Sequence, residues 1–138
     1  MATINMQTIR YINLLDKTSR VKTKKCFVYN GTIFFAVHRD LVSKAIGLNA
    51  LNVKKIQESL GKRVRIIREP EGHYDIQRFI LDVVSPIKFK SLEIKEGLVV
   101  ITAGSNQNKA ALIGRNRRRF SELESVVYEI FGMGLNVL

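Results

Sequence analysis

The sequence predicts an α+β fold made of two similar modules, each a small sheet with helices against one face. Three observations favour this fold class. Helical and strand-like hydrophobic spacings alternate in a regular order, this order occurs twice, and each copy has a glycine inside a helical stretch. With 138 residues, 46% of them hydrophobic, the chain is long enough to fold without disulfide support.

The first half contains five predicted elements. They are a helix up to residue 18, strands at 26–29 and 32–37, a helical stretch at 41–60 and a strand at 63–67. Asn30-Gly31 between the first two strands is the dipeptide best suited to a two-residue hairpin, because both positions tolerate positive φ. Gly47 interrupts the helical stretch and Gly61 ends it.

A linker at 69–72 separates the predicted domains 1–69 and 73–138, because Pro70 and Gly72 both disfavour continued regular structure. The same order of elements follows the linker. We expect a helix at 75–84, strands at 89–94 and 98–102 joined at Glu96-Gly97, a helical stretch at 108–131 containing Gly114, and a final strand at 135–138.

The two halves superpose with an offset of 67 residues at the interrupted helices. Gly47 then falls on Gly114, and the pairs that agree beside it are Ile46 with Ile113 and Asn49 with Asn116. The two hairpin turns differ by one residue from this offset. Sequence identity is slight, but both halves share the order helix, strand, strand, helix, glycine turn, helix, strand, when the helices on either side of the glycine are counted separately. This shared order indicates a duplicated module.

The interrupted helices are the candidate binding sites. A helix that stops at a glycine and restarts within four residues exposes the free N–H groups of the new helix, and the helix dipole favours a phosphate there. Glycine also lets a nucleic-acid backbone approach closely. The candidate residues are Lys44, Ile46, Gly47, Leu48, Asn49, Ala50 and Lys54 in the first turn, and Ile113, Gly114, Arg115, Asn116, Arg117, Arg118, Arg119 and Phe120 in the second.

The side chains of the second turn favour phosphate contact. Four arginines lie within five residues there, and guanidinium groups fork onto phosphates or stack on bases. A solvated helix face is the alternative for several of them. Ile46, Val53, Ile113 and Phe120 either line a groove for bases or belong to the helix–sheet core; Phe120 is the best candidate for a base platform.

The charge balance is consistent with a polyanionic partner. The chain has 23 Lys and Arg against 12 Asp and Glu, a net charge of +11. Nucleic acid is the commonest partner of such a chain, and a generally cationic, well-solvated surface is the alternative. The N-terminus lacks the apolar core of a signal peptide and no run is long enough to span a membrane, so we expect a cytoplasmic protein with no membrane partner.

An enzyme is not expected. Cys26 is the only cysteine and lies in an alternating stretch, where a buried apolar role is expected. His38 and His73 fall in a loop and at a helix start, and no carboxylate pair, metal-ligand spacing or nucleophile motif is present. We therefore expect no cofactor, no metal and no small-molecule substrate.

Taken together, these features resemble the type II KH domains, whose motif is Gly-x-x-Gly between two helices. The resemblance rests on the order of the elements, the Asn30-Gly31 hairpin and the segments 44–47 and 112–114, and covers nearly the whole chain. The tandem arrangement resembles the short archaeal NusA-like transcription factors with two KH domains. It implies two KH-like modules, each a three-stranded mixed sheet covered on one face by helices. The second glycine of the motif is replaced by Ala50 in one turn and by Arg117 in the other.

The resemblance implies binding of single-stranded RNA, about four nucleotides per module, in transcription elongation, pausing or termination. The transcription machinery is then a further partner, although the sequence gives no support for direct polymerase binding. The second module is expected to bind more strongly, with the first contributing through Lys44, Lys54 and Lys55. A ribosome-associated or ribosomal KH protein and a KH-derived protein-interaction module remain open as alternatives.

Overall fold

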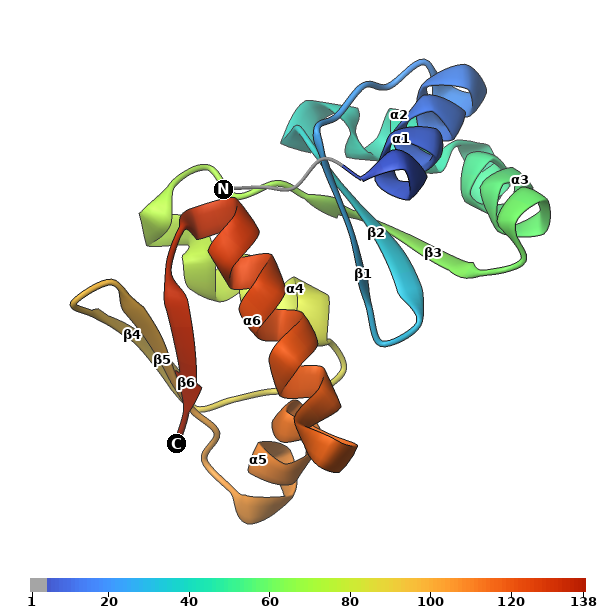
Figure 1. The fold of residues 1–138 in the computed structure, drawn as a ribbon. Helices are drawn as coiled ribbons and strands as arrows, with labels where there is room; N and C mark the ends of the chain where they lie inside the picture. Colours follow the sequence, from blue (N-terminus) through green and yellow to red (C-terminus); the bar gives the residue numbers. More distant parts are fainter. Residues whose placement is uncertain (1–4) are drawn as a thin grey trace. The chain divides into compact units, whose positions relative to one another are not determined.

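A computed structural model gives the fold and describes residues 5–138 (Figure 1). The chain divides into two compact units, one ending at Glu69 and the other comprising Pro70–Leu138. Each unit is α+β, with three helices and one three-stranded mixed sheet among the residues that the structure describes. This agrees with the fold class expected from the alternating hydrophobic spacing.

The order of the elements matches the prediction in both units. The first comprises helix α1 (Met6–Ser19), strands β1 (Lys25–Tyr29) and β2 (Thr32–Val37), helices α2 (Val42–Ile46) and α3 (Leu51–Leu60) and strand β3 (Arg63–Arg68). The second comprises helix α4 (Ile76–Val84), strands β4 (Ser91–Lys95) and β5 (Leu98–Thr102), helices α5 (Asn106–Ile113) and α6 (Arg118–Phe131) and strand β6 (Gly134–Val137).

The two sheets have the same topology. β1 and β2 form an antiparallel hairpin, and β3 returns parallel to β2 after the chain has passed through α2 and α3. β4, β5 and β6 repeat this arrangement. Each hairpin turns through two residues of positive φ, 52° and 69° at Asn30 and Gly31 and 50° and 75° at Glu96 and Gly97. These are the dihedrals that a type I′ hairpin requires.

The helices of the first unit pack on one face of its sheet. Tyr11 and Leu15 of α1 and Ile56 of α3 are buried against the sheet residues of that face, which include Ile33, Phe35, Val37 and Val64. Complete burial of such side chains contributes about 1.5–3 kcal/mol each. This packing holds α2 and α3 in place on either side of the first glycine turn.

The ends of several elements in the second unit differ from the prediction by one or two residues. The strand expected at 89–94 begins at Ser91, although the Lys90 N–H already donates to the Thr102 carbonyl at 2.8 Å. α6 has 14 residues where α3 has 10, so the repeat keeps its offset at the turns and loses it beyond them. A 3₁₀ turn, His73–Asp75, precedes α4.

Candidate nucleic-acid interface

Both helical stretches are interrupted at the predicted glycine. Gly47 lies between α2 and α3, and Gly114 lies between α5 and α6. One 3₁₀ turn follows each glycine, Leu48–Ala50 in the first unit and Arg115–Arg117 in the second. The turns therefore separate two helices in each unit, as the sequence indicated.

The two turns follow the same backbone path. Gly47 has φ 81° and ψ 167°, and Gly114 has φ 74° and ψ 172°. The last two residues of each 3₁₀ turn have left-handed dihedrals, with φ values of 53° at Asn49, 59° at Ala50, 55° at Asn116 and 58° at Arg117. Residues other than glycine rarely adopt left-handed dihedrals, so the fold sets this shared path and local preference does not.

Each glycine is required by close contact as well as by its dihedrals. A Cβ on Gly47 would lie 2.8 Å from Asn52 Nδ2, and a Cβ on Gly114 would lie 2.6 Å from Arg119 Cγ and 3.0 Å from the Arg119 backbone nitrogen. Asn52 also donates from its amide to the Lys44 carbonyl at 3.1 Å, which caps the end of α2. In each unit, the side chain of the second residue of the next helix, Asn52 or Arg119, thus fills the space that a Cβ on the glycine would need.

Each turn leaves two neighbouring amides without an acceptor. Gly47 N–H donates to the Ser43 carbonyl and Ala50 N–H to the Gly47 carbonyl, and the corresponding bonds are present in the second turn. Among residues 5–138, the N–H groups of Leu48 and Asn49, and likewise those of Arg115 and Asn116, have no hydrogen-bond acceptor. Such paired donors at a helix start are suited to an anion.

The exposed side chains of the first turn are mostly uncharged. Leu48 is 84% exposed and Asn49 is exposed, whereas Ile46 and Ala50 are half-buried. Lys44 before the turn and Lys54 after it are exposed and form no ion pair with any described residue. Val53, which follows on α3, packs against the core of the unit.

The second turn presents cations at the corresponding places. Arg115, Arg117 and Arg118 are exposed, and none pairs with a carboxylate in the part of the chain that the structure describes. Arg119 is half-buried, and its Nη1 lies 2.6 Å from the Glu122 carboxylate. Three of the four predicted arginines are therefore available to a ligand, and the fourth is held by a neighbouring acid.

Phe120 belongs to the core side of α6. Its ring is 9% exposed, and the guanidinium carbon of Arg117 lies 4.5 Å from the ring centroid. Phe120, Leu123 and Val127 recur at helical spacing and are all buried. The ring is not an open platform for a base; its outer side is covered by the Arg117 guanidinium. Ile113, which ends α5, is half-buried.

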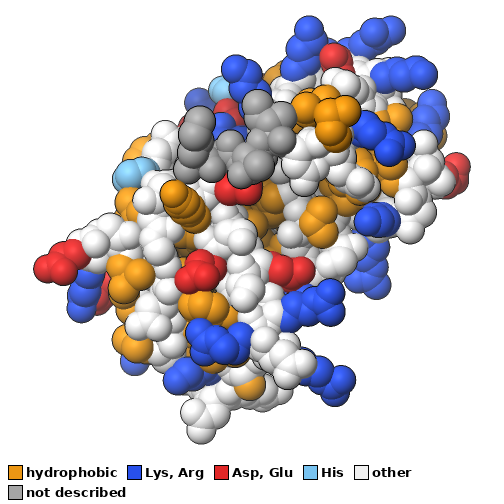
Figure 2. Space-filling view, in the orientation of Figure 1, with side chains coloured by type: hydrophobic (Ala, Val, Ile, Leu, Met, Phe, Trp, Pro, Cys, Tyr) orange, Lys and Arg blue, Asp and Glu red, His pale blue; other side chains and the backbone are white. Residues whose placement is uncertain are grey.

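The charge is divided unequally between the units. Residues 1–69 carry 14 Lys and Arg against 4 Asp and Glu, a net charge of +10. Residues 70–138 carry 9 against 8, a net charge of +1. In Figure 2 most of the blue side chains lie over the part of the surface that contains α1 and α3. The whole-chain charge concealed this difference, which a count for each half of the sequence reveals.

The remaining reactive side chains have structural surroundings. Burial raises the pKa of the Cys26 thiol from 9.0 to about 12, so the thiol is protonated at neutral pH, as expected for a buried apolar role. His38 Nδ1 accepts a hydrogen bond from the Asp40 N–H at 3.1 Å and caps a 3₁₀ turn. Within residues 5–138, no group of three or more His, Cys, Asp or Glu could hold a metal ion, and no helix is both long and apolar enough to cross a bilayer.

Similarity to known proteins extends over most of the chain. No protein-family model matches the sequence. The chain is 23% identical over 133 residues to the "Probable transcription termination protein NusA" of Methanococcus vannielii, covering 94% of this chain and 75% of that protein. It is 30% identical over 97 residues to the protein of the same name from Methanocaldococcus jannaschii, covering 69% of this chain and 51% of that protein, about half its length.

A solved structure shares the fold. The chain in "Crystal structure of APE1850" matches with a TM-score of 0.68 and 24% sequence identity, and the match covers 98% of this chain and 100% of that one. The sequence and structure comparisons thus both extend across the two units.

Proposed function

We propose that the protein binds single-stranded RNA through two type II KH-like units and acts in the control of archaeal transcription elongation or termination. The similarity to two archaeal proteins named as probable NusA supports the transcription role. The net charge of +11 supports a polyanionic ligand. A mixed three-stranded sheet with a glycine turn between two helices in each unit supports the KH-like assignment.

The observation that carries the proposal is the pair of unused amide N–H groups in each turn. The N–H groups of Leu48 and Asn49 in the first turn, and of Arg115 and Asn116 in the second, have no acceptor among residues 5–138. A phosphate oxygen satisfies such donors and gains from the positive end of the following helix dipole. Two such turns in one chain hold a strand at two places.

The second turn is the stronger phosphate contact in this proposal. Arg115 and Arg118 are exposed and unpaired among the described residues, so their guanidinium groups are free to fork onto phosphates. The first turn has Leu48 where the second has Arg115, and it depends on Lys44 and Lys54 for charge. Lysine interacts with phosphate as a point charge and gives less directional binding.

Arg117 takes over a role that the missing second glycine leaves open. Its left-handed backbone keeps the path of the turn, and its guanidinium is stacked on Phe120. The outer face of that guanidinium is a flat, cationic surface on which a base stacks. We propose that the aromatic contribution to base binding comes through Arg117 and not through direct contact with the Phe120 ring.

Binding rather than catalysis is the proposed activity. The Cys26 thiol stays protonated at neutral pH, and His38 uses one ring nitrogen to cap a turn. The turns themselves hold donors and cations, which position a strand without reacting with it. These surroundings support a role in recognition.

Anisotropy titrations with a fluorescein-labelled single-stranded RNA of about 12 nucleotides test the proposal, because two modules cover about four nucleotides each. The full chain should bind it more tightly than an RNA duplex of equal length. Arg115→Gln with Arg118→Gln should weaken binding and reduce the salt slope by about 1.4, or about 0.7 for each lost phosphate contact.

The control is Lys62→Gln with Lys95→Gln, which removes the same charge, in each unit away from its own glycine turn; Lys95 Nζ lies 3.1 Å from the Glu93 carboxylate. Lys62 follows the end of α3, about 15 Å from the start of that helix at 1.5 Å per residue, and Lys95 lies at the β4–β5 hairpin. Equal losses in the two double variants would remove the second turn from the binding site. Tighter binding to the duplex would favour a ligand of structured RNA, as in a ribosome-associated protein.

A further inference from the structure

A second group of cations lies on the connection between α1 and β1. Four cations lie among the eight residues 17–24, at the end of the helix and in the loop that follows, namely Lys17, Arg20, Lys22 and Lys24. All four are exposed, and none forms an ion pair with a residue that the structure describes. Lys25 differs, because its Nζ lies 3.3 Å from the Glu69 carboxylate.

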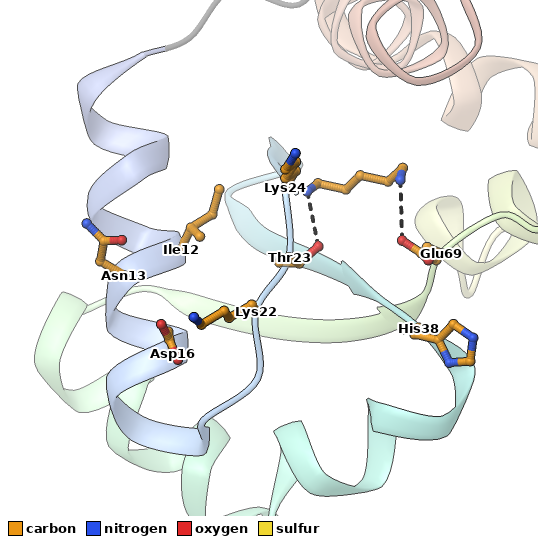
Figure 3. A pocket seen from close by; sticks show the side chains of 9 residues that line it. Ile12, Asn13, Asp16, Lys22, Thr23, Lys24, His38 and Glu69 are labelled. Atoms are coloured by element: carbon orange, nitrogen blue, oxygen red, sulfur yellow. Dashed lines mark hydrogen bonds and ion pairs between the residues drawn. The ribbon is translucent and has the colours of Figure 1, made fainter.

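A cavity of about 550 Å³ opens beside this connection (Figure 3). Residues of α1, of the α1–β1 connection and of the ends of β2 and β3 line it, namely Ile12, Asn13, Asp16, Lys22, Thr23, Lys24, Lys25, His38 and Glu69. All belong to the first unit. A volume of about 300–1,000 Å³ is typical of small-molecule sites.

The cavity lining has three lysines, Lys22, Lys24 and Lys25, against two carboxylates, Asp16 and Glu69. Glu69 is paired with Lys25, and the Asp16 carboxylate lies on the same side of α1 as Lys22 in Figure 3. The Thr23 hydroxyl already has two hydrogen-bond partners, because its Oγ1 donates to the Ala36 carbonyl at 2.5 Å and accepts from the Lys25 N–H at 3.1 Å. Asn13 is exposed, and its amide forms no hydrogen bond within residues 5–138.

We propose that this cavity is a nucleotide subsite of the first unit. Lys22 and Lys24 contact phosphates of a single-stranded RNA, while one base enters the cavity beside Ile12 and meets the free amide of Asn13. A neutral base fits beside the Lys25–Glu69 pair, whose charges offset one another, and phosphates fit Lys22 and Lys24, which form no ion pair within residues 5–138. The inference rests on the proposed RNA binding and extends it to a surface separate from the glycine turns.

The distribution of charge supports a polyanion here. The first unit has a net charge of +10, yet its glycine turn is flanked by few cations. The lysine pair also recurs at the equivalent connection of the second unit, where Lys88 and Lys90 follow Lys22 and Lys24 by 66 residues, the offset of the two hairpins. Both pairs are exposed. Because two exposed cations recur at the same place in both units, a common binding role is favoured over cations that only face solvent.

Salt-dependent anisotropy of the full chain with the same labelled RNA tests the inference. Lys22→Gln with Lys24→Gln should lower the affinity about tenfold at low salt and reduce the slope by about 1.4. Asn13→Ala should lower the affinity and leave the slope unchanged, because the amide meets a base and not a phosphate. Lys62→Gln with Lys95→Gln, which removes the same charge, should change the affinity less than about twofold.

The outcomes separate this inference from the function on which it rests. A chain that fails to bind the RNA overturns both. In a second outcome, the RNA affinity depends on Arg115 and Arg118 while the Lys22→Gln, Lys24→Gln variant binds as tightly as the charge control. That result overturns only the subsite. Unchanged RNA affinity in Asn13→Ala would mean that no base meets the Asn13 amide in the cavity, and it would overturn the proposal. Unfolding curves for each variant establish that the fold is intact.

Discussion

The two glycine turns share one backbone path and differ in two of the three side chains that follow the glycine. Gly47 and Gly114 agree in φ and ψ to within 7°, by the values of 81° and 167° against 74° and 172°. Leu48 in one turn is replaced by Arg115 in the other, and Ala50 by Arg117. In the proposed function, the backbone therefore provides the donors in both units, and the side chains set the strength of each contact.

The units also place their charge differently. Three exposed arginines of the second unit, Arg115, Arg117 and Arg118, are concentrated at its turn, within a net charge of only +1. The first unit spreads a net charge of +10 over α1, its loops, α3 and β3. Concentrated charge suits one directional contact, and spread charge suits a longer track along a strand. Substitutions at the turns and the pH dependence of unfolding test this contrast.

Alanine at the glycine of the second turn should have the largest effect. Gly114→Ala should destabilise the chain by about 3 kcal/mol, because it combines unfavourable dihedrals with a 2.6 Å contact to Arg119 Cγ. Gly97→Ala should cost about 1 kcal/mol, because its φ of 75° belongs to a type I′ turn and nothing lies within 4 Å of its Cβ position. Gly114 combines its φ of 74° with a ψ of 172°, a region essentially restricted to glycine. Urea unfolding measures both. Equal losses would mean that neither these dihedrals nor the close approach at Gly114 has energetic weight.

Cys26 should make the first unit sensitive to alkali. Its pKa rises from 9.0 to about 12 on folding, so stability is unaffected below about pH 9 and falls as the pH rises toward 12. The loss is about 1.4 kcal/mol at pH 10. The second unit has Leu92 at this position and lacks the effect. Between pH 8 and pH 10, the free energy of unfolding should fall by about 1.4 kcal/mol more in the wild-type chain than in Cys26→Ala. Equal falls in the two chains would contradict the buried thiol.

A cation added to the first turn should make it resemble the second. Leu48→Arg places a guanidinium beside the free amides and should tighten RNA binding by about 1 kcal/mol, with a salt slope larger by about 0.7. Ser59→Arg, on an exposed position near the end of α3, adds the same charge away from the turn. If both variants gain equally in anisotropy titrations, the gain comes from overall charge and not from the turn.

The smallest effects concern the second glycine of the motif. Ala50→Gly should stabilise the first unit by about 0.5 kcal/mol, because relief of the left-handed conformation exceeds the extra entropy of glycine. Arg117→Gly relieves the same conformation but loses the stack on Phe120, which contributes about 0.5–1 kcal/mol. Its stability should therefore stay near that of the wild type, as measured by urea unfolding. A clear gain in Arg117→Gly would show that the stack is weak.

Local pattern was sufficient for the elements and for the turns. β2 and β5 begin and end at the predicted residues, because an apolar run bounded by a two-residue turn leaves little freedom in register. The interruption at Gly47 could be predicted because helical spacing lies on both sides of a glycine, and glycine is unfavourable inside a continuous helix. These features depend on neighbours in sequence.

Features that depend on tertiary packing were less accessible. Phe120 was considered as a base platform because arginines surround it in sequence, but it lies on the buried stripe of α6 with Leu123 and Val127. That spacing of three and seven residues was present in the sequence and indicates a core position. The pairing of Arg119 with Glu122 is likewise a contact between adjacent helical turns. The cavity beside α1 joins residues 12–69 and has no local signature.

Chemical-shift mapping of the isotope-labelled full chain during titration with single-stranded RNA tests the central claim most directly. The account predicts that the amide signals of Leu48, Asn49, Arg115 and Asn116 move on binding, with the larger changes in the second turn. The hairpin amides at 30–31 and 96–97 should stay in place. Saturable RNA binding with no movement at the four turn amides would contradict the account.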